Sequence, residues 1–109
     1  MARRSLGEFE HLMMLAIFRL GSEAYGVPII AEVEEQTGRS VSQAAAYMTL
    51  RRLEDKGWIQ SRMSDPTPER GGRAKRYFEL RPAGLERLRE SRAALRQMWE
   101  GIAAELDRP

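Results

Sequence analysis

The stretch SVSQAAAYMTLRRLEDKG, residues 40–57, decides how this chain folds. Its pattern predicts a helix that begins at Ser40 or Ser42, either of which can cap the first turn, and that runs to about Lys56. Gly57 closes the helix, because glycine readily adopts the left-handed conformation that ends helices. The chain therefore carries a well-marked helix near its middle.

The two sides of this helix differ in chemistry. At about 100° per residue, one side forms an apolar stripe that faces a core. This stripe consists of Ala46, Leu50 and Leu53. The opposite side consists of Ala44, Ala45, Met48, Arg51 and Arg52, with Tyr47 on its flank. Small side chains let a backbone approach base edges in a major groove, and arginines farther along can reach phosphates. We interpret the helix as a recognition helix; the alternative is a surface helix with two incidental arginines.

A second helix precedes it, from about Tyr25 to Gln36. Pro28 fits the first turn, where its missing N–H costs nothing, and Thr37 and Gly38 end the helix. The residues predicted to face inward are Val27, Ile30, Ala31 and Val33, with the glutamates facing outward. Because the link from Gly38 to Val41 is short, the two helices predict a helix-turn-helix.

After Gly57 the hydrophobic period changes to two residues, which predicts two strands, Trp58–Met63 and Lys75–Arg81. The alternation puts Ile59, Ser61 and Met63 on one side of the first strand, and Arg76, Phe78 and Leu80 on one side of the second. The loop from Ser64 to Ala74 is longer than a hairpin needs and contains arginines. We expect it to lie on a phosphate backbone or to insert an arginine into a minor groove; the alternative is a solvated loop.

The first helix, predicted from Ser5 to Leu20, is apolar on every side. Ser5 can cap it, with Glu8 three residues on as in a capping box. A helix that is apolar all round needs to be buried all round, which one small domain rarely achieves. We therefore expect one face to meet a partner subunit.

The last helix is predicted to start at Pro82 and to continue to about Leu106. Its apolar residues step by three and four like a coiled-coil seam that Arg92 interrupts, and Gly101 is expected to bend or fray its end. With the first helix, this seam predicts a symmetric homodimer. The predicted dimer contacts are Phe9, Met13, Leu85, Leu88, Leu95, Trp99, Ile102 and Leu106.

Composition excludes several classes of function. A chain of 109 residues, 42% hydrophobic and 31% charged, suits one folded domain. It has no cysteine and only His11, so we expect no disulfide, no metal site and no cofactor. We also expect a cytoplasmic protein with no membrane contact, because neither a signal peptide nor a long apolar run is present.

Charge is unevenly distributed although the net charge is only +2. Residues 22–38 contain four acidic and no basic side chains, whereas residues 51–81 contain nine basic and five acidic ones. A concentrated positive patch is typical of nucleic-acid binding; the alternatives are a solvated face or a winged-helix module that docks an acidic protein. An enzyme is not expected, because the chain has no phosphate-binding glycine loop and no close Ser, His and Asp set. His11 is expected to be a packed or interfacial side chain.

The predicted order is three helices, a small two-stranded β wing and a long helix. This is a mainly α, winged helix-turn-helix plan, with the DNA-binding part in residues 1–81 and a C-terminal dimerisation helix in residues 82–109. In this order the chain resembles the PadR family of bacterial transcriptional regulators, most closely over about residues 5–90. The matching motifs are LGEFE (6–10), AYG (24–26), YMTLRRLEDKGWI (47–59), ERGGR (69–73), KRYF (75–78) and LRPAG (80–84).

The resemblance implies a homodimer that binds an inverted-repeat operator in double-stranded DNA. It further implies repression of nearby transporter or detoxification genes until a small effector loosens the complex. Tyr47 and Arg51 match helix residues near the DNA, Arg73 and Lys75 match the basic wing, and Tyr25 matches an aromatic that either packs or contacts a phosphate. With the exposed helix face, the predicted DNA contacts are Ser42, Gln43, Ala44, Tyr47, Met48, Arg51, Arg70, Arg73 and Lys75.

Trp99 on the seam is the candidate to face a flat aromatic effector, the alternative being a plain core residue. The chain also departs from the family pattern. Met48 stands where a proline is common, and Arg81 replaces a threonine that would cap the last helix, a loss of about 1 kcal/mol.

Overall fold

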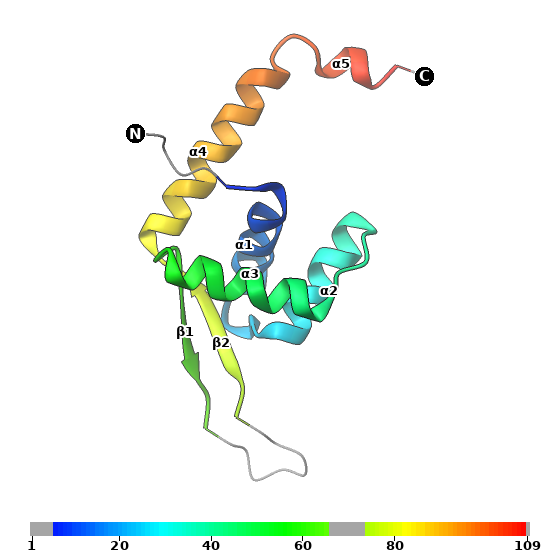
Figure 1. Cartoon of the computed structure of the whole chain (residues 1–109). Helices are drawn as coiled ribbons and strands as arrows, with labels where there is room; N and C mark the ends of the chain where they lie inside the picture. Colours follow the sequence, from blue (N-terminus) through cyan, green and yellow to red (C-terminus); the bar gives the residue numbers. More distant parts are fainter. Residues whose placement is uncertain (1–5, 66–73, 109) are drawn as a thin grey trace.

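The computed structural model describes residues 6–65 and 74–108. Its helices are α1 (Glu8–Leu20), α2 (Gly26–Thr37), α3 (Gln43–Asp55), α4 (Pro82–Trp99) and α5 (Ala103–Leu106), with a 3-10 turn, η1 (Gly21–Glu23), after α1. Strands β1 (Ile59–Met63) and β2 (Arg76–Leu80) form one antiparallel sheet. In Figure 1 the two strands extend downward from the body of α1, α2 and α3, while α4 projects in the opposite direction. The predicted mainly helical fold with a two-stranded wing is confirmed.

One apolar core joins α1, α2, α3 and the base of the sheet. Helix α1 lies at its centre, because Met13, Met14 and Ile17 are all at most 2% exposed. The predicted stripe of α3 is confirmed, since Ala46, Leu50 and Leu53 are buried against the same core. The sheet and α4 complete the core with Trp58, Ile59, Phe78 and Leu88.

The start of α1 differs from the prediction. The helix begins at Glu8, with Gly7 in the capping position, and the predicted cap Ser5 lies outside the described residues. The Glu10 carboxylate accepts a hydrogen bond from the Gly7 N–H at 3.0 Å, which satisfies a donor that the first turn leaves free. The acidic residue therefore acts two positions later than the capping box predicted from Ser5 and Glu8.

The inward face of α2 was predicted wrongly in part. Ile29 and Val33 are buried with Gly26, whereas Val27 is 60% exposed and Ala31 is also exposed. The apolar residues of α2 form two overlapping stripes at helical spacing, and the packing of α2 on α1 selects the one that contains the small Gly26.

The structure supplies the register that the strand patterns left open. Ile59 pairs with Leu80, Ser61 with Phe78 and Met63 with Arg76, so the two predicted sets lie on the same side of the sheet, where Ile59 and Phe78 are buried. Each strand is shorter than predicted, because Trp58, Lys75 and Arg81 lie just outside the paired region.

The segment between α1 and α2 pairs with the open edge of β2. The Phe78 N–H donates to the Ala24 carbonyl at 2.8 Å, and Tyr25 forms an isolated antiparallel bridge with Tyr77. The wing is thereby attached to the first residues of α2.

Helix α4 approaches the wing very closely at Gly84. A Cβ atom added there would overlap the backbone carbonyl of Trp58, and that same carbonyl accepts a hydrogen bond from the Arg81 N–H at 2.9 Å. The Arg81 side chain makes no capping hydrogen bond, as its replacement of a threonine predicted, and Pro82 occupies the first turn.

The long terminal helix predicted from Pro82 to Leu106 is interrupted. Helix α4 ends at Trp99, Gly101 adopts a left-handed conformation with φ 84°, and a separate short helix, α5, follows. The glycine that was expected to bend the end instead breaks the helix. Ile102 and Leu106 therefore do not continue the seam of α4. No helix in residues 6–65 or 74–108 is long and apolar enough to cross a membrane.

Candidate nucleic-acid interface

Helix α3 is fixed in place by its cap and its buried side. The Ser42 hydroxyl accepts a hydrogen bond from the Ala45 N–H at 3.0 Å, which selects Ser42 over Ser40 as the N-cap. Thr49 is buried together with the predicted stripe. Because one side of α3 is sequestered in the core, its opposite side is held facing solvent.

That opposite side carries the predicted contact residues. Gln43, Ala44 and Arg51 are exposed, as are Tyr47 (47%) and Met48 (62%). The exposed side chains are small near the N-terminus of α3, at Ala44 and Ala45, and basic farther along, at Arg51 and Arg52, as predicted. This arrangement can bring a helix backbone close to base edges while guanidinium groups reach phosphates.

Tyr47 also contacts α2. A Cβ atom at Gly26 would overlap the ring and hydroxyl end of Tyr47, so the tyrosine lies directly against the first residue of α2. Gly26 therefore leaves the space that the Tyr47 ring occupies, and the N-terminus of α2 lies beside the exposed face of α3.

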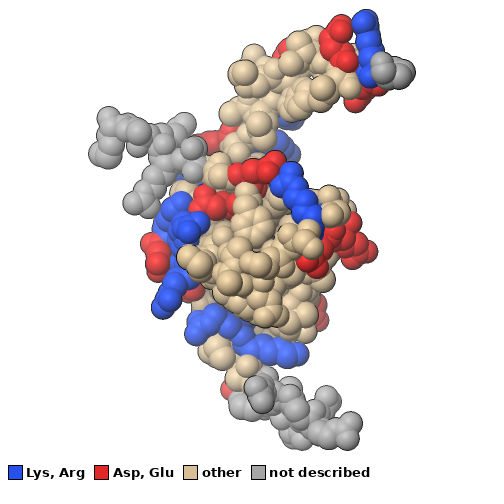
Figure 2. Space-filling model, turned by 45° about the vertical axis from the view of Figure 1, so that its right-hand side comes forward, with Lys and Arg blue, Asp and Glu red and all other residues tan. Residues whose placement is uncertain are grey.

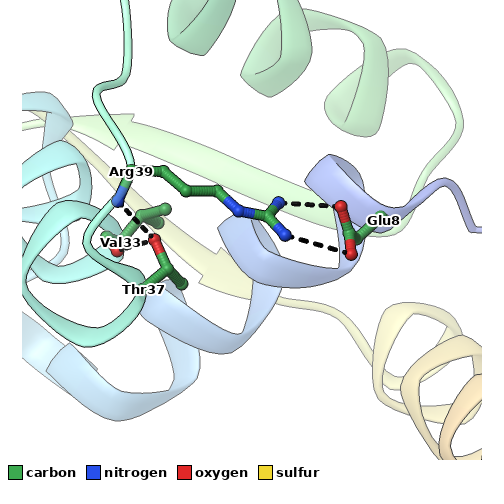
Figure 3. Close-up of polar contacts among 4 residues, drawn as sticks. All are labelled: Glu8, Val33, Thr37 and Arg39. Carbon is green, nitrogen blue, oxygen red and sulfur yellow. Dashed lines mark hydrogen bonds and ion pairs between the residues drawn. The ribbon is translucent and has the colours of Figure 1, made fainter.

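The turn between α2 and α3 is held by a chain of hydrogen bonds (Figure 3). The Thr37 hydroxyl donates to the Val33 carbonyl at 2.7 Å and accepts from the Arg39 N–H at 3.2 Å. The Arg39 guanidinium then makes two hydrogen bonds to the Glu8 carboxylate, at 2.7 and 3.3 Å. These bonds lower the pKa of Glu8 and connect the helix-turn-helix to the first turn of α1. The pair is exposed, so its contribution to stability is small.

A buried pair anchors the other end of α3. The Lys56 ammonium lies 2.9 Å from the Glu10 carboxylate and 4.8 Å from the centre of the Trp58 ring. Burial raises the pKa of Glu10, but hydrogen bonds from Gly7 and Lys56 outweigh it, so the pKa is lowered overall. The pair joins α1 to the residue where α3 ends.

The end of the wing that lies away from the core carries a row of contacting side chains that we call the wing stack: Arg62, Tyr77 and Lys75 from the wing, and Tyr25 from the segment before α2. Lys75 was predicted as a contact residue and is exposed. Arg62 and Tyr77 were missed, although the alternation of the second strand already put Lys75 and Tyr77 on one side. The other predicted wing residues, Arg70 and Arg73, lie outside the described residues.

Charge is segregated on the surface. In Figure 2 lysine and arginine side chains gather on the lower part of the coloured surface, and acidic side chains lie on the right-hand flank. This agrees with the acidic residues 22–38 and the basic residues 51–81.

The predicted dimer contacts differ in burial and fall into three groups. Met13 is 0% exposed and Leu88 6%, so both belong to the core of the single chain; the prediction for Met13 is wrong, because no part of it reaches the surface. Phe9 and Leu85 are half-buried against the same core. The large apolar side chains that remain exposed on the outer helices are Leu15, Phe18, Leu95, Met98, Trp99, Ile102 and Leu106.

A groove of about 650 Å³ lies along the surface between α1 and α4. Leu12, Leu15 and Leu95 line it, and the His11 Nδ1 lies 2.9 Å from the Ser91 hydroxyl across it. Burial lowers the pKa of His11. His11 is thus a packed side chain between the two helices, as expected.

The comparisons with known proteins agree with this geometry. A family model described as the transcriptional regulator PadR-like family matches residues 14–90. The solved PadR family transcriptional regulator from Eggerthella lenta is 26% identical, with a TM-score of 0.68, covering 94% of this chain and 88% of that one. A PadR family transcription regulator from Clostridium difficile is 23% identical, with a TM-score of 0.67, covering 88% of this chain and 98% of that one.

A third solved structure, Bacillus subtilis PadR in complex with operator DNA, is 20% identical, with a TM-score of 0.61. The match covers 76% of this chain and 45% of that one. No curated protein matches the sequence. The family and these structures are described as transcriptional regulators and not as enzymes, in agreement with the sequence prediction. Because the family model matches more than half of the residues of this chain, the chain belongs to the PadR-like family of transcriptional regulators.

Proposed function

We propose that the protein is a homodimeric, DNA-binding repressor that acts in the bacterial cytoplasm on an inverted-repeat operator. The observation that carries the proposal is the outward face of α3, whose residues are all exposed: Gln43, Ala44, Tyr47, Met48 and Arg51. The likeness to Bacillus subtilis PadR, solved with operator DNA, supports the same use of the fold. In this proposal α3 enters the major groove, and Ser42, Arg70, Arg73 and Lys75 contact the DNA around it.

Dimerisation would place two copies of α3 about 34 Å apart, in successive major grooves on one side of the duplex. The exposed apolar residues of α1 and α4 support this assembly, because a monomer seldom leaves such a surface in water. Residues 1–81 would form the DNA-binding part and residues 82–109 the dimerisation part. Leu95 and Trp99 on α4, with Ile102 and Leu106 beyond the break, would contact the partner.

Repression of nearby genes and release by a small aromatic effector complete the proposal. Trp99 is 43% exposed, so its ring is available to a partner chain or to a flat ligand between two chains. An effector acts only if it binds the DNA-competent and DNA-incompetent arrangements of the dimer unequally.

Fluorescence anisotropy with duplex DNA tests the proposal. Binding is expected to weaken steeply as salt rises, with a slope of log K against log salt of about −0.9 for each phosphate contact. Substituting Met48 or Gln43 is expected to change which sequence is preferred in a selection from random duplexes. A protein that binds no duplex at any salt, or that sediments as a monomer at micromolar concentration, contradicts the proposal.

A further inference from the structure

The wing stack occupies the solvent side of the sheet. Arg62 and Tyr77 are directly paired across the two strands, and Tyr25 bridges to Tyr77 from the other edge of β2. Side chains alternate along a strand, so Lys75, two residues before Tyr77, projects on this same side. Phe78 is buried on the opposite side. The four side chains therefore come from three segments of the chain and meet on one face.

Two aromatic rings hold the two cations of this stack. The Lys75 ammonium lies 4.5 Å from the centre of the Tyr25 ring, and the Arg62 guanidinium carbon lies 5.1 Å from the centre of the Tyr77 ring. The two rings contact each other edge to face, with their centres 5.4 Å apart. The result is a row in which a cation lies at each end and two rings lie between them.

Lys75 and Arg62 contact rings and are exposed to solvent, so their positive charges are not cancelled by the contact. Some arginines are held by carboxylates, as Arg19 is by Glu32 and Arg39 by Glu8, and such pairs cancel charge. Within residues 6–65 and 74–108, Lys75 and Arg62 form no ion pair. A ring face orients a cation without neutralising it and leaves its N–H donors available.

The wing stack is continuous with the exposed face of α3. Tyr25 immediately precedes Gly26, and Gly26 lies against Tyr47. Tyr47 of α3 and Tyr25 of the wing stack are therefore joined through Gly26, at the start of α2. A duplex lying on α3 would meet the stack with its backbone.

We propose that Arg62 and Lys75 form a preorganised clamp for two phosphates of a nucleic-acid backbone, and that Tyr77 is the positioning residue that holds Arg62 in place. The clamp rests on the proposed DNA-binding function and adds two residues, Arg62 and Tyr77, to the interface. Ordering a long side chain on binding costs conformational entropy. Because the rings already restrict Arg62 and Lys75 in the free protein, less entropy is lost when the nucleic acid binds.

The test uses the full chain and a mixed-sequence duplex of about 30 base pairs, because a phosphate clamp needs no particular operator. Affinity is measured by anisotropy over a series of salt concentrations for Arg62→Gln, Lys75→Gln, Tyr77→Val and Tyr77→Phe. Arg108→Gln, an exposed cation beyond α5, is the matched control for loss of one charge. Thermal unfolding of each variant identifies any that fail to fold.

For each bound chain, Arg62→Gln and Lys75→Gln are each expected to reduce the salt slope by about 0.9 and the affinity at 0.1 M salt by about eight-fold. Tyr77→Val keeps both charges, so we expect an unchanged slope with affinity lowered by about three-fold per chain. Tyr77→Phe keeps the ring and is expected to bind like the wild type, as is Arg108→Gln.

Two results overturn the proposal. If both cation variants keep the wild-type slope and affinity, no phosphate is bound at the wing stack. If Tyr77→Val binds like Tyr77→Phe, the ring has no positioning role. A wild-type chain that binds no duplex is a different outcome, because it contradicts the DNA-binding function itself before any variant is compared.

Discussion

Replacing Gly84 by alanine tests how closely α4 is docked on the wing. The added Cβ atom would overlap the carbonyl of Trp58, a backbone group already held by the hydrogen bond from the Arg81 N–H. Neither atom can rotate away, so α4 has to shift. Overpacking of this kind costs about 3 kcal/mol at the upper end of its usual range, whereas alanine gains about 1 kcal/mol over glycine in a helix. The net expectation is a loss of about 2 kcal/mol.

That loss converts into a change in Tm. At about 2.1 cal/mol/K per residue, 109 residues give an unfolding entropy near 0.23 kcal/mol/K, so about 2 kcal/mol lowers Tm by about 9 °C. The assay is thermal unfolding by circular dichroism at one fixed protein concentration, since association shifts Tm. Ala93→Gly, at an exposed position of the same helix, measures the propensity effect alone and is expected to lower Tm by about 4 °C. A Tm for Gly84→Ala equal to or above the wild type would refute the reasoning.

The other expectations concern Gly26 in α2 and two residues of α1, Glu10 and His11. Gly26→Ala is expected to push the Tyr47 ring aside and to weaken DNA binding without a fall in Tm, and unchanged affinity would show that Tyr47 does not touch DNA. Glu10→Gln is expected to cost about 2 kcal/mol in urea unfolding at pH 7, because it leaves the half-buried Lys56 ammonium unpaired. Since the folded-state pKa of Glu10 is below 4.5, the wild-type advantage should persist above pH 4.5 and disappear as pH falls through the folded-state pKa; a constant difference would exclude the ion pair as its source. Burial lowers the pKa of His11 below 6.5, so its contribution is complete above pH 6.5 and declines as pH falls toward the folded-state pKa, a decline that should be absent in His11→Gln.

The fold followed from the sequence wherever a local signal and tertiary packing agreed. The stripe of Ala46, Leu50 and Leu53 has a single helical phase, and the alternation around Phe78 allows only one side of the strand to face a core. Packing decided where the sequence offered two solutions, as in α2, where Ile29 is buried in place of Val27.

Two further differences between the predicted and the observed structure arise from features that hydrophobic periodicity does not reveal. Met13 looked like an interface residue because α1 is apolar all round, but α1 lies at the centre of the core and buries that position within one chain. The seam beyond Trp99 had the right spacing, yet spacing does not register the left-handed backbone of Gly101.

Part of the candidate interface could also be predicted. Ser42, Tyr47 and Met48 were found because a helix wheel separates exposed from buried positions. Arg62 and Tyr77 were not predicted as contact residues. Their proposed roles depend on the pairing of the two strands and on Tyr25, which is far from both in the sequence and meets Tyr77 only when the chain folds.

The segregation of charge also affects how the molecule approaches a partner. With cations around the wing and carboxylates over α2, each chain is an electric dipole as well as a weakly positive body. A polyanion such as a duplex exerts a torque on such a dipole within about a Debye length of contact, roughly 8 Å at physiological ionic strength. A duplex is repelled by the acidic later turns of α2 and attracted by the cations of the wing, so the orientation of approach is selected before any base is contacted.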